Sequence, residues 1–233
     1  EIDKGRANAC QIMGRVLYEL YKEIPFSLCY LNGGLKDNAI PRQAEAVIVC
    51  PEKWQPEINT KIAEISSEIK HEFLETDPLI LVEVKKTTIV EKELAMTKDS
   101  ADKMITALLC LPGGIQKMSF QMKGLVQTSL NLGIMKTERD HVSLSFSVRS
   151  SVESEKRALL DQIACLTKTL GGTVTTNGDY PAWEYLENSP LRDLMCRIFE
   201  EQYGREPIVE ALHAGVECGI FAGKIPGLDC VSF

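Results

Sequence analysis

The chain has 233 residues, of which 44% are hydrophobic and 25% charged, and its formal net charge is -7. This balance is typical of a globular protein and excludes a disordered or fibrous chain. Acidic and basic residues are interspersed without a basic stripe, so nucleic acid is not expected as a partner. The longest apolar runs, such as residues 79–82, are far too short to cross a bilayer, so a membrane is not expected either. No signal-peptide pattern begins the sequence, and we expect a cytoplasmic protein.

The cysteines support the same compartment. None of the eight lies in a Cys-x-x-Cys spacing, and several fall inside apolar stretches, as Cys50 does. We therefore expect buried thiols in a reducing compartment, and neither disulfides nor zinc fingers.

Helical and strand patterns alternate along the first part of the chain. The predicted elements are a helix over residues 6–23, strands over 26–31 and 44–50, a helix with apolar residues from Ile58 to Phe73, and a strand over 79–87. Apolar residues spaced three and four apart indicate the helices, and Pro25 ends the first one.

A similar order of elements recurs in the second part. The predicted elements are a helix over 100–111, strands over 125–135 and 142–148, a helix after the capping-box spacing of Ser150 and Glu153, and a short strand over 173–176. The strand at 142–148 alternates apolar residues with serine, so one face is buried and the other faces solvent or a cleft. We predict an α/β (α+β) fold of two β-α-β-β-α-β-like half-units, with antiparallel sheets backed by helices.

The pattern changes after residues 177–178. Residues 180–183 form an aromatic connector, and a helix over 190–203 begins with an N-cap and a proline. Residues 205–233 are predicted to form a strand, a glycine-rich turn, a short helix and a final strand over 229–233. We place a domain boundary near residue 185.

One short stretch concentrates groups that could bind a ligand. His213 and Glu217 lie four residues apart among glycines, which permit close backbone approach. The alternative is an ordinary surface pair at the start of a helix. The other two histidines, His71 and His141, lie far along the chain, and a zinc site needs three or four ligands. A self-contained zinc site is therefore not expected.

Three further polar residues each have two interpretations. Arg149 ends the alternating strand, where it either holds a substrate carboxylate through both of its nitrogens or lies along the sheet edge as a surface residue. Asn38 lies in a predicted loop, where hydrogen bonding within the turn is the default. Asn131 lies within a predicted strand, where a solvent-facing position is the simplest explanation.

Five stretches, in this order along the chain, carry a family resemblance. They are residues 1–9, 38–41, 145–151, 180–183 and 212–221. Together they resemble the aminoacyl-histidine dipeptidases, also called cytosolic non-specific dipeptidases, which are the carnosinase-like branch of the co-catalytic zinc peptidases.

The resemblance implies a metallo-dipeptidase that hydrolyses unblocked dipeptides such as Xaa-His. Its catalytic domain holds two zinc ions, and a lid domain is inserted into it. Residues 1–185 would be the lid, which serves substrate recognition and is a candidate surface for homodimerisation. Residues 186–233 would be a partial α/β segment of the catalytic domain. The zinc ligands and catalytic residues of the family would lie outside this sequence, so we expect no catalytic residue, no zinc and no activity in these 233 residues alone.

The resemblance also implies substrate contacts for five residues. Asn38 and Arg149 would bind the C-terminal carboxylate of the dipeptide from the lid, with Asn131 as a competitor for the role of Asn38. Gly215 would offer its backbone at the floor of the cleft, near His213 and Glu217. The alternative to a peptidase is a non-enzymatic α/β module that binds a small molecule or mediates oligomerisation.

Overall fold

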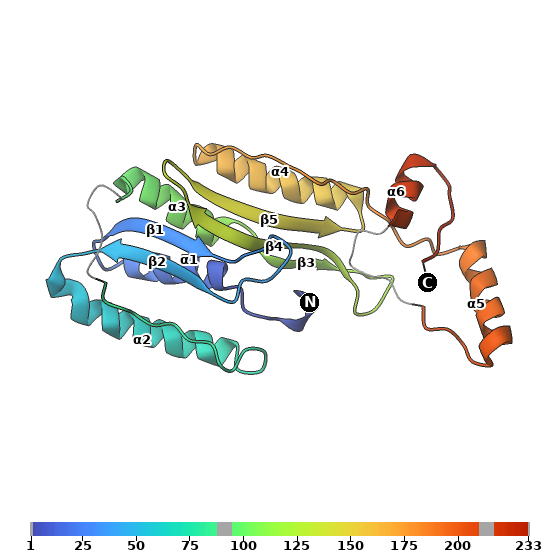
Figure 1. Cartoon of the computed structure of the whole chain (residues 1–233), viewed down its shortest axis with the longest axis horizontal. Coiled ribbons are helices and arrows are strands. Elements are labelled where there is room, and N and C mark those ends of the chain that lie inside the picture. Colours follow the sequence, from blue (N-terminus) through green and yellow to red (C-terminus); the bar gives the residue numbers. More distant parts are fainter. Residues whose placement is uncertain (1, 88–94, 210–216, 233) are drawn as a thin grey trace. The chain divides into compact units, whose positions relative to one another are not determined.

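In the part of the chain that the structure describes, Figure 1 shows six helices and five strands, which follow one another along the chain in the order α1-β1-β2-α2-α3-β3-β4-β5-α4-α5-α6. The computed structural model describes residues 2–87, 95–209 and 217–232. The helices are α1 (Ala9–Tyr21), α2 (Gln55–Glu72), α3 (Lys98–Cys110), α4 (Glu153–Thr169), α5 (Pro190–Tyr203) and α6 (Glu217–Lys224). The strands are β1 (Ser27–Gly33), β2 (Ala44–Val49), β3 (Gly114–Met118), β4 (Val126–Thr137) and β5 (Val142–Ser150). Short 3-10 turns lie at Ile2–Lys4 and Glu52–Trp54.

The chain divides into two compact units. Unit 1 comprises residues 1–114, 130–147 and 166–172, and unit 2 comprises residues 115–129, 148–165 and 173–233. Strands β4 and β5 and helix α4 each contribute residues to both units. The predicted domain boundary near residue 185 falls within unit 2 and stays a prediction.

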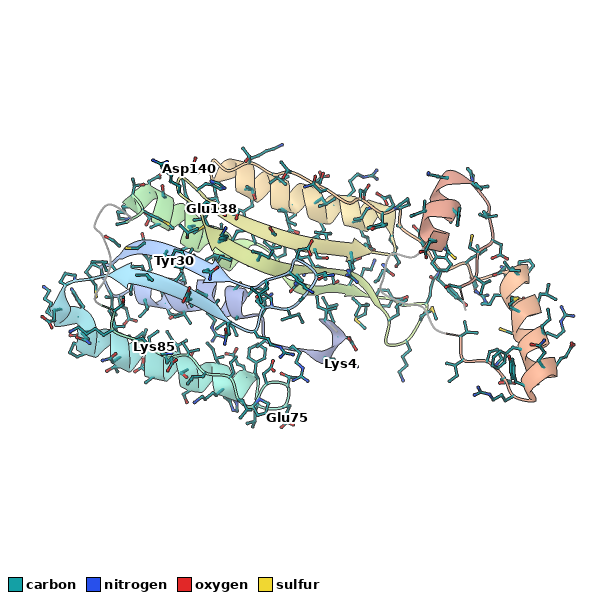
Figure 2. The ribbon with its side chains drawn as sticks, viewed as in Figure 1. Lys4, Tyr30, Glu75, Lys85, Glu138 and Asp140 are labelled. Carbon is teal, nitrogen blue, oxygen red and sulfur yellow. The ribbon has the colours of Figure 1, made fainter. Side chains whose placement is uncertain are left out.

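An antiparallel ladder organises unit 1. Strand β1 pairs with β2 from Ser27 opposite Val49 to Gly33 opposite Ala44, and it pairs with β4 where Asn32 lies opposite Lys136. The strand order is β2-β1-β4-β3, and β5 also pairs with β4. The hairpin between β4 and β5 turns at Glu138 and Asp140, which Figure 2 labels.

Two apolar faces of α1 hold unit 1 together. One face, with Leu17, packs against the sheet and against Ile105 of α3. The other, with Val16 and Leu20, packs against the isoleucines that α2 presents at helical spacing. Full burial of each such side chain stabilises the fold by about 1.5–3 kcal/mol. Figure 1 shows α2 running along the β2 side of this unit.

The mixed α/β fold, with an antiparallel sheet backed by helices, is confirmed. Helices α1, α2, α3, α4 and α5 and strands β1, β2, β4 and β5 all lie where the sequence predicts them, with small differences at their ends. Strands from both predicted half-units join one five-stranded sheet.

Four details of the predicted pattern are wrong. Residues 79–87 form no strand; Ile80 and Val82 instead pack against the cluster between α1 and α2. Residues 173–176 and 229–232 also form no strand. Strand β3 was not predicted, because three of its five residues are glycine, glutamine and lysine and give no apolar alternation.

Local capping explains both ends of α5 in unit 2. Ser189 accepts a hydrogen bond from Arg192 N at the start of α5, and Gly204 ends that helix with a left-handed φ of 65°. The short helix predicted in the C-terminal stretch is α6, whereas residues 210–216 lie outside the described residues. Among the helices that the structure describes, none is long and apolar enough to cross a membrane.

Candidate functional site

The predicted site residues fall in different parts of the structure. Asn38 lies in unit 1, whereas Arg149 and Glu217 lie in unit 2. His213 and Gly215 lie outside the described residues. The grouping of the five residues into one site therefore stays a prediction.

Asn38 lies at the turn of the loop between β1 and β2. It is exposed, and its backbone N–H donates to Asp37 Oδ1 at 2.8 Å. The carboxylate of the preceding residue thus stabilises the turn, which agrees with the expected turn chemistry. The side-chain amide of Asn38 remains on the accessible surface of this loop.

Asn131, on β4, holds this loop through hydrogen bonds from its buried side chain. It is 9% exposed, and its Nδ2 donates to the carbonyl of Asp37 at 3.0 Å and to that of Ala39 at 2.9 Å. The interpretation of Asn131 as a solvent-facing strand residue is therefore wrong. Its polar side chain is tolerated within the strand because the loop and the start of α1 supply hydrogen-bond partners.

Asn8 completes this buried group. Its Oδ1 caps α1 by accepting from Cys10 N at 3.0 Å and Gln11 N at 3.2 Å. Its Nδ2 donates to Asn131 Oδ1 at 3.0 Å and to the carbonyl of Leu132 at 2.9 Å. The start of α1, β4 and the Asn38 loop are thus joined by two side-chain amides, a connection that no local sequence signal reveals.

Two glycines allow the loop to lie directly on β4. Gly34 has a left-handed φ of 74°, and a Cβ at this position would overlap the carbonyl oxygen of Gly133. A Cβ at Gly133 would overlap the backbone of Asp37. The C-terminal end of the loop is held as well, because Ala9 N donates to the carbonyl of Pro41 at 3.0 Å.

Arg149 lies near the end of β5 and is exposed. The residues around it are fixed by hydrogen bonds to β4. Ser150 Oγ lies 2.8 Å from Thr128 Oγ1, and Ser151 N donates to the carbonyl of Gln127 at 3.0 Å. The backbone that carries Arg149 is thereby held in register with its neighbour strand.

The carboxylate of Glu155 connects this strand end to α4. It accepts from Gln127 Nε2 at 2.9 Å and from Thr128 Oγ1 at 2.5 Å, and it forms an ion pair with Lys117. Burial alone would raise the pKa of Glu155, but the hydrogen bonds from Gln127, Lys117 and Thr128 lower it to about 2. Glu155 is therefore an ionised anchor at neutral pH.

Lys156 fixes the aromatic connector. Its side chain is 9% exposed, and its Nζ lies 2.7 Å from Asp179 Oδ1 and 3.0 Å from Glu153 Oε2. Nζ also donates to the carbonyl of Tyr180 at 2.6 Å. Burial lowers the pKa of Lys156, but the hydrogen bonds to Asp179 and Glu153 outweigh it and raise the pKa above its ordinary value.

Helix α6 packs on this connector through its glycines. A Cβ at Gly223 would lie 2.7 Å from Pro181 Cβ, and one at Gly219 would lie 3.3 Å from Trp183 Cβ. Glu217 is the first residue of α6 and is exposed. Its position on the surface agrees with either of the two interpretations of the His213–Glu217 stretch.

Comparison with known proteins gives this geometry a context. The model of the family described as "Peptidase dimerisation domain" matches residues 1–77. The cytosol non-specific dipeptidase of Escherichia coli (strain K12) is 29% identical over 232 residues, which cover 100% of this chain and 47% of that protein. The crystal structure of aminoacylhistidine dipeptidase from Vibrio alginolyticus matches with a TM-score of 0.91 and 27% identity, covering 97% of this chain and 46% of that one.

The chain is similar to the aminoacylhistidine dipeptidases. It spans about half the length of the two relatives that it matches. The resemblance drawn from the five sequence stretches is therefore confirmed.

The residues that the structure describes do not form a metal centre by themselves. No group of three or more His, Cys, Asp or Glu side chains in the described ranges could hold a metal ion. The described residues therefore do not supply a site that fits the zinc ions implied by the resemblance.

Proposed function

We propose that these residues belong to a dipeptidase that hydrolyses unblocked dipeptides such as Xaa-His. The observation that carries the proposal is the match over 97% of the chain to an aminoacylhistidine dipeptidase structure, with a TM-score of 0.91. The similarity to a cytosol non-specific dipeptidase over the full length of the chain supports the same activity and a cytoplasmic location. The two zinc ions of such an enzyme would be held by residues outside this sequence.

In this proposal residues 1–185 form a lid that recognises the free C-terminal carboxylate of the dipeptide. Arg149 supplies the positive charge, because a guanidinium presents two parallel N–H donors that match a carboxylate. Asn38 supplies a neutral amide donor. Both residues are exposed. The hydrogen bonds from Asn131 on either side of Asn38, and those of Ser150 and Ser151 directly after Arg149, support these roles.

Residues 186–233 would return to the catalytic domain. There Gly215 would offer its backbone to the substrate, with His213 and Glu217 beside it. Such a division would leave recognition to the present residues and bond cleavage to residues outside the sequence. The described residues would then show no dipeptidase activity alone.

The substitution Arg149→Ala in the full-length protein tests the carboxylate role. Removing one partner of a charge-assisted pair costs about 2–5 kcal/mol, because the other charge is left without its partner. We therefore expect kcat/KM for a dipeptide with a free carboxylate to fall by roughly one and a half to three and a half decades, at about 1.4 kcal/mol per decade. Arg149→Lys should restore little, because an ammonium cannot reproduce the planar fork.

The matching dipeptide amide separates binding from folding. The amide lacks the carboxylate, so it should be a poor substrate for the wild type and should lose little more in Arg149→Ala. Arg157→Ala, at an exposed position of α4 in the same unit, serves as the control and should leave kcat/KM for both substrates unchanged. Equal losses for the acid and the amide, or a lowered melting temperature alone, would show that Arg149 is structural.

A second role, compatible with the first, is homodimerisation. The family model that matches residues 1–77 is described as a peptidase dimerisation domain. Strand β2 stands at the end of the strand order, and such a strand can offer backbone groups to a second copy. Sedimentation of the full-length protein over a range of concentrations tests this role. A monomer at all concentrations would remove it, and would also remove the alternative of a purely oligomerising module.

A further inference from the structure

We propose that Asn131 is a positioning residue for Asn38, and that Asn8 sets the orientation of Asn131. The inference deepens the proposed function and rests on it, because it concerns how the loop presents its amide to the substrate carboxylate. The observation that carries it is the pair of hydrogen bonds from Asn131 Nδ2 to the carbonyls of Asp37 and Ala39, at 3.0 and 2.9 Å. These two carbonyls belong to the residues immediately before and after Asn38.

The orientation of the Asn131 amide is determined by its neighbours. Two carbonyl oxygens accept from Nδ2, so the nitrogen must face the loop. Asn131 Oδ1 accepts from Asn8 Nδ2 at 3.0 Å. Asn8 in turn cannot exchange its amide oxygen and nitrogen, because its oxygen accepts two backbone N–H groups at the start of α1. The first turn of α1 therefore determines, through two amides, where the peptide groups around Asn38 lie.

The same geometry assigns the substrate contact to Asn38. Both N–H bonds of Asn131 are donated within the protein, and its side chain is buried, so no donor remains for a substrate carboxylate. Asn38 is exposed on the loop that Asn131 holds. The two asparagines thus have separate roles: Asn131 holds the loop from the protein interior, and Asn38 contacts the substrate from the loop surface.

A positioning role differs from a structural one in its consequences. Asp37 and Ala39 belong to an exposed loop, so the loop can move outward until water satisfies the carbonyls that have lost the Asn131 amide. Removing the Asn131 amide should therefore loosen the loop more than it destabilises the fold. An enzyme is sensitive to such loosening, because displacement of a binding group by about 1 Å can reduce the rate about a hundredfold.

Hydrogen exchange on the full-length protein tests the loop independently of activity. In Asn131→Leu, which keeps the branched shape of the side chain and removes the amide, the Gly34 and Ala39 amides should exchange roughly 10–100-fold faster. Both amides are hydrogen-bonded within the loop, to the carbonyls of Gln43 and Lys36 respectively. Asn32→Ala on β1 is the matched control, because Asn32 donates to Glu45 and makes no contact of this kind with the loop. Unchanged exchange of the loop amides in Asn131→Leu would overturn the proposal.

A second variant covers the outcome in which Asn131→Leu does not fold. Asn8→Ser keeps an oxygen that can cap α1 but removes the donor to Asn131 Oδ1. The same loop amides should then exchange faster, by a smaller factor. If Asn8→Ser leaves their exchange unchanged, the orientation of Asn131 does not depend on Asn8 and the proposed chain of positioning fails.

Dipeptide kinetics connect the loop to the substrate. Asn38→Ala should lower kcat/KM for the free acid far more than for the matching amide. Asn131→Leu should give a loss of the same kind, roughly 5–50-fold, and Asn38→Ala combined with Asn131→Leu should be no worse than Asn38→Ala alone. Additive losses, or equal losses for the acid and the amide, would overturn the positioning role.

The two proposals fail in different ways. If neither Asn38→Ala nor Arg149→Ala discriminates between the acid and the amide, the carboxylate-binding function fails, whatever the exchange results. If both discriminate and Asn131→Leu does not, the function stands and the positioning role is refuted.

Discussion

Replacing Glu155 by glutamine should weaken the protein in a way that depends on pH. The carboxylate of Glu155 is the common acceptor for Gln127, Thr128 and Lys117, and it connects α4 to the strand end that carries Arg149. Glutamine has nearly the same shape but no charge. The substitution therefore removes the ion pair and weakens two hydrogen bonds without creating a cavity.

The magnitude follows from the pKa of this carboxylate. A pKa of about 2 in the folded state, against 4.5 ordinarily, corresponds to about 3 kcal/mol of stability at neutral pH. The side chain is 24% exposed, and screening by water reduces this figure to about 1–2 kcal/mol. Since the folded-state pKa is the lower one, this contribution is fully present above pH 4.5 and is lost as the pH falls toward 2.

Urea unfolding at several pH values provides the assay. At pH 7, Glu155→Gln should lower the free energy of unfolding by about 1–2 kcal/mol, and the gap to wild type should narrow steadily between pH 5 and pH 3. Asp161→Asn, at an exposed position of the same helix, is the control for a lost surface charge. A gap below about 0.3 kcal/mol at pH 7, or one that does not change with pH, would refute the reasoning.

Two further predictions concern unit 1. In Gly133→Ala the new methyl group would meet backbone atoms of Asp37, so the loop must move, and we expect a loss of about 1–3 kcal/mol in unfolding free energy together with faster exchange of the Ala39 amide. In Gly172→Ala the new methyl group would meet the Thr167 methyl at 2.8 Å but no backbone atom closer than 3.3 Å, so this variant should cost less. Equal losses would contradict the close approach of the loop to β4. Burial raises the pKa of the Cys10 thiol to about 11, so iodoacetamide should not label Cys10 in the native protein at pH 8, whereas the exposed Cys110 should react. Labelling of both at similar rates, measured by mass spectrometry, would show that the core around Cys10 opens readily.

Helix positions could be predicted from the sequence because their causes are local. The apolar spacing of α2 and the cap and glycine that bound α5 lie within a few residues of the structure that they determine. The strand pattern at 142–148 was equally informative, since Val142, Leu144 and Phe146 pack against the core. The family resemblance added the candidate roles of Asn38 and Arg149.

Strands were harder to predict from the sequence than helices, because a strand needs a pairing partner. Residues 79–87 have strand-like composition, yet no strand among the described residues pairs with them. Strand β3 has the opposite character, with a polar composition but a partner in β4. A strand is stabilised by hydrogen bonds to another segment, so its formation depends on residues that the local pattern does not include.

The support beneath the candidate site was decided by the tertiary structure alone. Asn8 and Asn131 are 123 residues apart in sequence, and neither lies in a motif that predicts their contact. Asn131 alone had a simpler explanation, as a solvent-facing strand residue, and position 8 fell inside the predicted helix over 6–23. Only the fold places the start of α1, β4 and the Asn38 loop together, because the buried amides need partners that water cannot supply there.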